Sequence, residues 1–162
     1  MSKQAKGAKD NGLKTSGVIA NNRKAYHEFH VLETLEAGLV LTGTEIKSCR
    51  LAKVAMADAH ARIENGEAWL YGLNISPYEA GTYNNHSPTR PRKLLLHKRQ
   101  ISKLRGKLAE KGLTLIPLKL YFSKCWVKVD LGVCQGKKLY DKRDAMKERD
   151  TQRDIDRAVR RG

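Results

Sequence analysis

Lys and Arg side chains gather in two stretches of the 162-residue sequence, and both stretches have the chemistry to bind phosphates. From His86 to Lys111 there are nine Lys/Arg and one Glu, and from Gly136 onward there are ten Lys/Arg and six Asp/Glu. Residues 1–16 carry a net charge of +3. These residues and the two stretches together account for the net charge of +15, so the remaining residues sum to zero. This pattern predicts a localised basic face for a polyanion, first a nucleic acid and second an acidic membrane surface. The simpler alternative is a helix whose Lys and Arg only meet solvent.

Residue sets for catalysis or metal binding are not evident. The string His27-Glu28-Phe29-His30 resembles a metal-binding motif, but on a strand its two imidazoles would point to opposite faces. The sequence has no CxxC pair, phosphate-cradling glycine loop or nucleophile elbow. We therefore expect a binding protein with no cofactor, metal or catalytic residue. An enzyme with an unrecognised site is the weaker alternative.

The cysteines and the hydropathy pattern indicate the cellular compartment in which the protein works. Three scattered cysteines fit small buried thiols of a reduced, cytoplasmic protein better than a disulfide framework. No apolar run is long enough to span a membrane, and residues 1–16 read as a flexible polar tail without the apolar core of a signal peptide. We expect a cytoplasmic protein without membrane contact.

Alternating apolar residues predict a body of short strands over residues 17–135. The strand patterns cover residues 17–20, 24–35, 39–41, 57–64, 69–75, 113–122 and 125–133. Glu36-Ala37-Gly38 reads as a turn, and Asn65-Gly66 is a strong hairpin signal. Pro117 restricts its strand to an edge or a bulge.

Two helices are expected among these strands. One runs from about residue 45 to 51, with Thr44 as its N-cap. The other runs from about Lys93 to Lys111, with an apolar stripe that contains Leu94, Ile101, Leu104 and Leu108. The polar segment 79–92 before it is long enough to be either functional or disordered.

These elements predict a mainly β (α+β) fold, namely a small closed antiparallel barrel of the oligonucleotide-binding (OB) type with added helices. Closing a sheet removes its exposed edges, and a sandwich suits so short a body less well. The aromatic motif with which ribonucleoprotein domains stack bases is missing, so backbone and shape recognition of structured RNA is favoured.

Residues 136–162 form a separate basic tail with too few apolar side chains to fold alone. Arg149, Arg153, Arg157 and Arg161 recur every four residues, and like charges at this spacing oppose a helix by about 0.2–0.5 kcal/mol per pair. Asp–Arg pairs act in the opposite direction. We predict a flexible tail that becomes helical when phosphates neutralise the arginines.

The sequence resembles the small protein B family (SmpB, the SsrA-binding proteins of bacterial trans-translation) over nearly its whole length. The resemblance lies in five stretches in family order: NNRKAYHEF (21–29), EAGLVLTGTEIKSCR (36–50), WLYGLNISPY (69–78), TRPRKLLLHKRQI (89–101) and GKKLYDKR (136–143).

The resemblance implies an OB-type barrel with a flexible C-terminal tail that acts as an RNA-binding adaptor. Such a protein binds the tRNA-like domain of transfer-messenger RNA (tmRNA, or SsrA RNA) at the elbow of its D and T regions. It delivers alanyl-tmRNA, with elongation factor Tu as an indirect partner, to ribosomes stalled on messages without a stop codon. The implied partners are tmRNA and the small ribosomal subunit with its rRNA, and the chain is expected to be a monomer. A structural component of a ribonucleoprotein, such as a ribosomal protein, shares the charge and barrel but gives no reason for a separate tail.

By motif match, the expected tmRNA contacts are Asn22, Lys24, Glu36, Leu95 and His97, with the adjoining cations Arg92, Lys93 and Lys98. On pattern alone Leu95 fits the core and Glu36 fits a turn; the resemblance assigns both to the RNA face. His97 stands where relatives often have Asn.

In the tail, the resemblance implies contacts with the decoding centre and the empty messenger-RNA channel. The expected ribosome-binding residues are Gly136, Lys137, Lys138, Tyr140, Asp141, Lys142, Arg143, Arg149, Arg153 and Arg157. Tyr140 stands where relatives often carry His. Ala158-Val159 is smaller than the bulky apolar pair of relatives.

Overall fold

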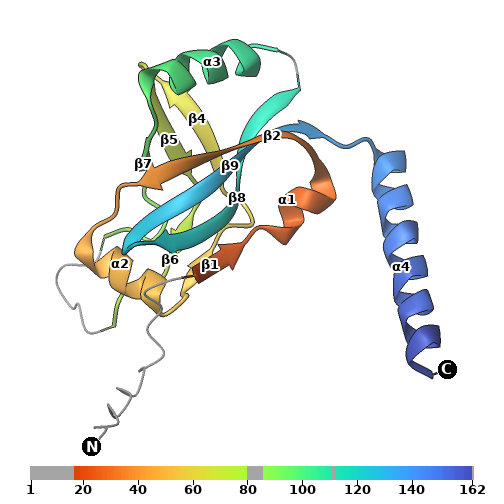
Figure 1. The fold of residues 1–162 in the computed structure, drawn as a ribbon. Helices are drawn as coiled ribbons and strands as arrows, with labels where there is room; N and C mark the ends of the chain where they lie inside the picture. The colour runs from red at the N-terminus through yellow and green to blue at the C-terminus, as the bar shows by residue number, and fades with distance from the viewer. Residues whose placement is uncertain (1–16, 80–85, 111, 162) are drawn as a thin grey trace, which may run out of the picture.

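The barrel and its projecting C-terminal helix are seen in a computed structural model, which describes residues 17–79, 86–110 and 112–161, except for the side chains of residues 139–141 (Figure 1). The elements in chain order are β1 (Gly17–Asn21), α1 (Arg23–Glu28), β2 (Phe29–Leu39), α2 (Gly43–Arg50), β3 (Val54–Ala55), β4 (His60–Glu64), β5 (Glu67–Tyr71), β6 (Asn74–Ile75), β7 (Arg92–Leu95), α3 (Lys98–Leu108), β8 (Leu113–Ser123), β9 (Trp126–Gly136) and α4 (Leu139–Arg161).

The main sheet closes on itself. It has seven strands in the order β1-β8-β4-β5-β7-β2-β9, and β8 also pairs with β9, so only β1 lies outside the ring. Every pairing is antiparallel. The register of β8 shifts between Pro117 and Lys119, the bulge that a proline without an N–H imposes. The predicted closed antiparallel barrel with added helices is confirmed.

Apolar side chains from all around the ring fill the barrel. Leu70, Leu94, Leu115, Leu120, Val129 and Leu131 are buried there, and Leu104 of α3 is buried against the same core. Helix α3 lies across one end of the barrel (Figure 1). Glu33 of β2 accepts a hydrogen bond from Lys107 and lies 3.7 Å from Lys103. These ion pairs fix α3 over β2.

The predicted strand 24–35 is wrong in its first half, where α1 forms instead. The buried Asn22 amide starts this helix: its Oδ1 accepts from Ala25 N at 3.1 Å, and its Nδ2 donates to Met56 O and Pro117 O at 3.1 and 2.9 Å. Both donated bonds reach residues far along the chain, so no local pattern could reveal them.

The predicted turn at Glu36-Ala37-Gly38 is also wrong, because β2 runs through it to Leu39 and no strand returns over 39–41. Glu36 and Gly38 pair with Asp130 and Lys128 of β9. A Cβ on Gly38 would lie 3.2 Å from Cβ of Leu95, so this glycine permits a close approach between strands.

The predicted helix 93–111 divides into β7 and the shorter α3. Arg92 and Leu94 are buried while Lys93 and Leu95 face outward, an alternation of period two. Leu94 therefore reaches the core from a strand. Helix α2 also begins earlier than expected, at Gly43, and its N-cap is Thr42, whose N–H donates to Glu45 Oε2 at 2.9 Å.

The predicted hairpin around Asn65-Gly66 is confirmed, with shorter strands. The first strand starts at His60, and Ala57 is exposed. The second ends at Tyr71 because Gly72, at φ +72°, turns the chain, and its buried face carries Ala68 and Leu70. Trp69 and Tyr71 therefore do not share a face with Leu73 and Ile75, which reach the core beyond the turn.

The cysteines only partly match expectation. Cys49 and Cys134 are buried, and burial raises the pKa of their thiols to about 12 and about 11. Cys125 is exposed, because it lies in the tight turn between β8 and β9 with a φ of +67°.

The predicted tail is the helix α4, which stands apart from the barrel (Figure 1). Its residues from Met146 to Arg161 are exposed, so the barrel does little to stabilise it. Its disorder in the free protein stays a prediction. Residues 1–16 and residues 80–85 of the loop 79–92 lie outside the described residues.

Candidate nucleic-acid interface

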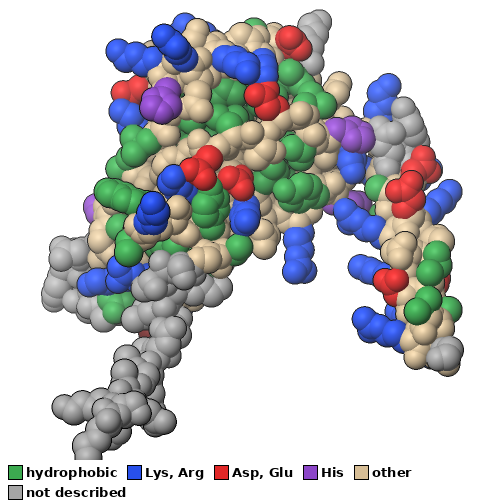
Figure 2. Space-filling view, in the orientation of Figure 1, with side chains coloured by type: hydrophobic (Ala, Val, Ile, Leu, Met, Phe, Trp, Pro, Cys, Tyr) green, Lys and Arg blue, Asp and Glu red, His purple; other side chains and the backbone are tan. Residues whose placement is uncertain are grey.

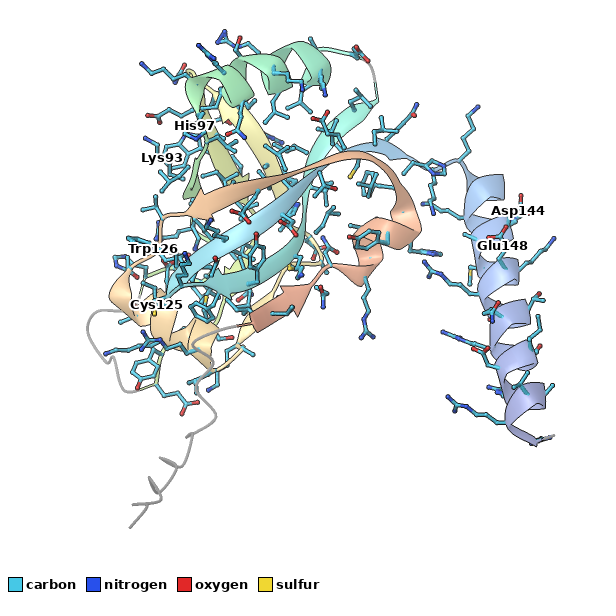
Figure 3. All side chains as sticks on the ribbon, viewed as in Figure 1. Lys93, His97, Cys125, Trp126, Asp144 and Glu148 are labelled. Carbon is cyan, nitrogen blue, oxygen red and sulfur yellow. The ribbon has the colours of Figure 1, made fainter. Side chains whose placement is uncertain are left out.

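A groove of about 940 Å³ runs between β2, β7 and the start of α3, and it contains five of the eight predicted RNA contacts. They are Glu36, Lys93, Leu95, His97 and Lys98. Lys128 of β9 completes the wall beside Glu36. Lys93 and His97 lie at the same end of the barrel, where Lys and Arg side chains surround α3 (Figures 2 and 3).

Strand β7 positions the cation and the apolar side chain of the groove. Its outward residues are Lys93, whose Nζ donates to Glu67 Oε1 at 2.9 Å, and Leu95, which is 54% exposed. The pattern-based alternative of a core role for Leu95 is therefore wrong, since Leu94 takes that role. An exposed leucine between cations offers a base or ribose an apolar surface within an otherwise polar site.

Glu36 is held as an ionised acceptor. Lys128 Nζ donates to its Oε1 at 2.5 Å, and the Tyr121 hydroxyl donates to its Oε2. The hydrogen bond from Lys128, followed by that from Tyr121, lowers the pKa of Glu36. Burial and the hydrogen bond to the Glu36 carboxylate raise the pKa of Tyr121, so the phenol keeps its proton. A fixed carboxylate can accept from the N–H groups of a base edge or from a 2′-hydroxyl.

His97 and Lys98 come together at the first turn of α3. His97 N donates to Gln100 Oε1 at 3.0 Å, which fixes the backbone where β7 passes into the helix. Both side chains are exposed. An imidazole can donate and accept hydrogen bonds, and the ammonium beside it can meet a phosphate.

Arg92 and Asn22 are buried, and their observed contacts are internal. Arg92 is fully buried: it donates to Glu45 Oε1 at 3.0 Å and to the carbonyls of Leu73 and Pro88 at 2.6 and 2.9 Å. Asn22 caps α1 and is 2% exposed. In this structure Arg92 supports the groove strand β7 from its buried side, and Asn22 holds α1 to Met56 and Pro117. Lys24, the remaining predicted contact, lies outside the groove, with its Nζ 3.1 Å from Asp58 Oδ1.

Lys128 is a groove residue that sequence reasoning missed. The signal was present, because Lys128 lies on the polar face of an alternating strand. The sequence could not show that Lys128 lies next to β2, because its pairing with Gly38 joins two strands that are far apart in the chain.

The start of the tail is tied to α1. Gly136 ends β9, and Lys137 then donates from its N–H to Glu28 O at 2.9 Å and from Nζ to Tyr26 O at 3.1 Å. Farther along α4, Arg153 and Arg157 lie 3.9 and 3.8 Å from Asp150 and Asp154. The other predicted tail residues with described side chains, Lys138, Lys142, Arg143 and Arg149, belong to the same segment, and Lys and Arg line one side of α4 (Figure 2). The side chains of Tyr140 and Asp141 lie outside the described residues.

Two absences concern only the described part of the chain. Among its residues, no group of three or more His, Cys, Asp or Glu could hold a metal ion. Within the same residues, none of the helices combines the length and apolar character that a membrane crossing requires.

Comparison with known proteins points to one family. A family model described as SmpB protein matches residues 19–161. The SsrA-binding protein of Carboxydothermus hydrogenoformans is 59% identical over 143 residues, which is 88% of this chain and 96% of that protein. The SsrA-binding protein of Desulforamulus reducens is 55% identical over 157 residues, 96% of each chain.

A solved structure agrees. It is described as "tmRNA-SmpB: a journey to the center of the bacterial ribosome" and is 49% identical, with a TM-score of 0.65, over 78% of this chain and 87% of the other. The match of the family model to most of the chain, together with relatives above 50% identity over nearly their full length, establishes that this chain belongs to the SmpB protein family.

Proposed function

We propose that this protein binds the tRNA-like domain of tmRNA through the groove and delivers alanyl-tmRNA to stalled ribosomes for trans-translation. The observation that carries the proposal is the convergence of Glu36, Leu95, His97 and Lys98 in one groove, with Lys93 and Lys128 beside them. The names of the relatives, SsrA-binding protein, and the solved tmRNA–SmpB structure support the same RNA.

The groove has the composition that folded RNA requires. Lys93, Lys98 and Lys128 can neutralise phosphates, while Glu36 and His97 can hydrogen-bond base edges and ribose hydroxyls. Leu95 supplies the apolar contact. Because the groove is open and rigidly framed by strands, it suits a preformed surface such as the elbow of a tRNA-like fold. Arg92 supports this surface from the buried side of β7, Asn22 holds α1 to the barrel, and Lys24 is a peripheral cation.

The tail serves a second site in this proposal. Residues 17–135 form the RNA-binding body, and residues 136–162 engage the small ribosomal subunit at the decoding centre and the empty messenger-RNA channel. The exposed Arg149, Arg153 and Arg157 suit rRNA phosphates on a surface distinct from the groove. Residues 1–16 are an additional basic tail. The protein works as a cytoplasmic monomer without catalytic activity of its own, and elongation factor Tu meets it through alanyl-tmRNA.

Truncation tests this division. Deleting residues 137–162 should leave the affinity for the tRNA-like domain nearly unchanged and abolish tagging of stalled peptides. Loss of RNA binding in the truncated protein would overturn the division into body and tail. Stoichiometric retention on ribosomal subunits after high-salt washing would instead identify a structural ribosomal protein.

A further inference from the structure

The most exposed large apolar side chain of the described barrel belongs to Trp126, at the tip of the β8–β9 hairpin. Its side chain is 74% exposed and lies beside Cys125 (Figure 3). Ser123 and Trp126 pair directly, and the two residues between them, Lys124 and Cys125, have φ values of +48° and +67°. This is a tight two-residue turn on a paired ladder, so the indole is carried on a rigid hairpin. An indole held on a paired hairpin presents a flat apolar face and a polar N–H edge to any molecule that docks beside it.

A hollow of about 350 Å³ lies beside Trp126 and continues the RNA groove. Val40, Leu41, Ile46 and Leu95 give the hollow an apolar lining. Gly38, Leu95 and Lys128 line both the hollow and the groove. The surface therefore changes in character along its length, from cationic at Lys98 to apolar and aromatic at Trp126, with Lys128 at the junction.

The occupant of the hollow follows from this continuity. A nucleic acid strand that leaves the groove past Leu95 would have its phosphates near Lys128 and its next base over the hollow. An unpaired base presents a flat π-face that can stack on an indole beside aliphatic side chains, while its polar edge stays in solvent. A separate protein partner would have to meet a patch that opens directly onto a cationic groove.

We propose that an unpaired base of the RNA held in the groove stacks on the indole of Trp126 over the hollow lined by Val40, Leu41 and Leu95. The inference rests on the proposed function and adds to it the recognition of one unstacked nucleotide. Stacking of this kind is tolerant of base identity, so it selects an extruded base at a defined distance from the groove.

The test combines affinity with intrinsic fluorescence in the full-length chain. The probe is the in-vitro-transcribed tRNA-like domain of tmRNA. Trp126→Ala should weaken its binding by about 5- to 150-fold, the range expected for one base–aromatic stack, whereas Trp126→Phe should retain most of the affinity. Trp126→Leu keeps an apolar side chain without a ring, so it should behave like the alanine variant.

The second tryptophan, Trp69, supplies the control. In Trp69→Phe, the emission comes from Trp126 alone and should be quenched as RNA is added. In Trp126→Phe, the emission comes from Trp69 and should change much less. Because Trp126 is exposed, the unfolding midpoint in urea should be the same in all Trp126 variants as in the wild-type protein.

The outcomes separate the inference from the function on which it rests. Full affinity of Trp126→Ala, or wild-type affinity of Trp126→Leu, would overturn base stacking while leaving RNA binding in place. Normal RNA affinity of Trp126→Ala combined with lost ribosome association would assign the hollow to a ribosomal surface and would also overturn it. Failure of the wild-type protein to bind the probe would overturn the proposed function itself.

Discussion

Lys128 of β9 donates a hydrogen bond from Nζ to Oε1 of Glu36 on β2, at 2.5 Å, across neighbouring strands of the barrel. Both side chains line the groove, and Tyr121 donates to the second carboxylate oxygen. The carboxylate is thus charged and fixed in direction before RNA arrives. This pre-organisation reduces the entropy lost when a flexible side chain is ordered on binding.

The pKa of Glu36 gives a direct check of this arrangement. We expect its carboxyl to titrate below the ordinary value of 4.5, because Lys128 and Tyr121 donate to the ionised form. A pKa lowered by folding contributes stability above the unfolded-state value, and that contribution is lost as the pH falls through the folded-state value. Carboxyl NMR titration measures the pKa. In Lys128→Ala it should rise toward 4.5, and an unchanged titration would contradict control by the ion pair.

Leu94 and Leu95 form a matched pair on one strand. Leu94 is buried, so Leu94→Ala should lower the free energy of unfolding by about 2–5 kcal/mol. Leu95 is exposed in the groove, so Leu95→Asp should leave stability nearly unchanged and weaken binding to the tRNA-like domain by about tenfold, or ~1.4 kcal/mol. Urea unfolding and RNA titration separate the two effects. A large loss of stability in Leu95→Asp would mean that this residue belongs to the core.

The buried ion pair between Glu45 and Arg92 lies outside the groove lining and should contribute strongly to the free energy of unfolding. Glu45→Ala leaves the fully buried Arg92 without its carboxylate and should lower the free energy of unfolding by about 3–5 kcal/mol. Glu79→Ala breaks a pair with Lys53 that is exposed to solvent, so its effect should be below about 1 kcal/mol. Urea denaturation of both variants compares them. Equal stabilities would show that the buried pair does not support β7.

The tail should be a helix only in the presence of its partner. A peptide of residues 137–162 should be mostly disordered in low salt by far-ultraviolet circular dichroism, and it should gain helix when a polyanion neutralises Arg149, Arg153 and Arg157. Replacing these three arginines with glutamine removes the charge but keeps helix-forming side chains. That variant should lose ribosome-dependent tagging without losing RNA affinity. A fully helical free peptide would contradict the conditional helix.

Much of the barrel was predictable because its signals are local. The alternation of Leu118, Leu120 and Phe122 and of Val127, Val129 and Leu131 predicted the strands β8 and β9, and Asn65-Gly66 predicted the β4–β5 turn. The errors arose where distant contacts decide the conformation. Helix α1 depends on the hydrogen bonds from Asn22 to Met56 and Pro117. Gly38 leaves room for the side chain of Leu95 on the neighbouring strand β7.

The site was predictable in part for the same reason. Motif matching found Glu36, Leu95 and His97, which the barrel brings into one groove. Arg92 was expected on the RNA face because it adjoins the matched residues, but the alternation of β7 turns it inward to Glu45. Lys128 was overlooked because its strand carries no net excess of charge, and only strand pairing brings it beside Glu36.

Crosslinking from the groove in living cells tests the central claim most directly. A photo-reactive side chain replaces His97 in the full-length protein, the cells are irradiated, and the attached RNA is sequenced. The same group at Lys53, an exposed residue outside the groove, is the control. We predict that reads from position 97 concentrate in the tRNA-like domain of tmRNA and that position 53 gives few. Reads from position 97 that fall on ribosomal RNA instead, or that match those from position 53, would contradict tmRNA binding through this groove.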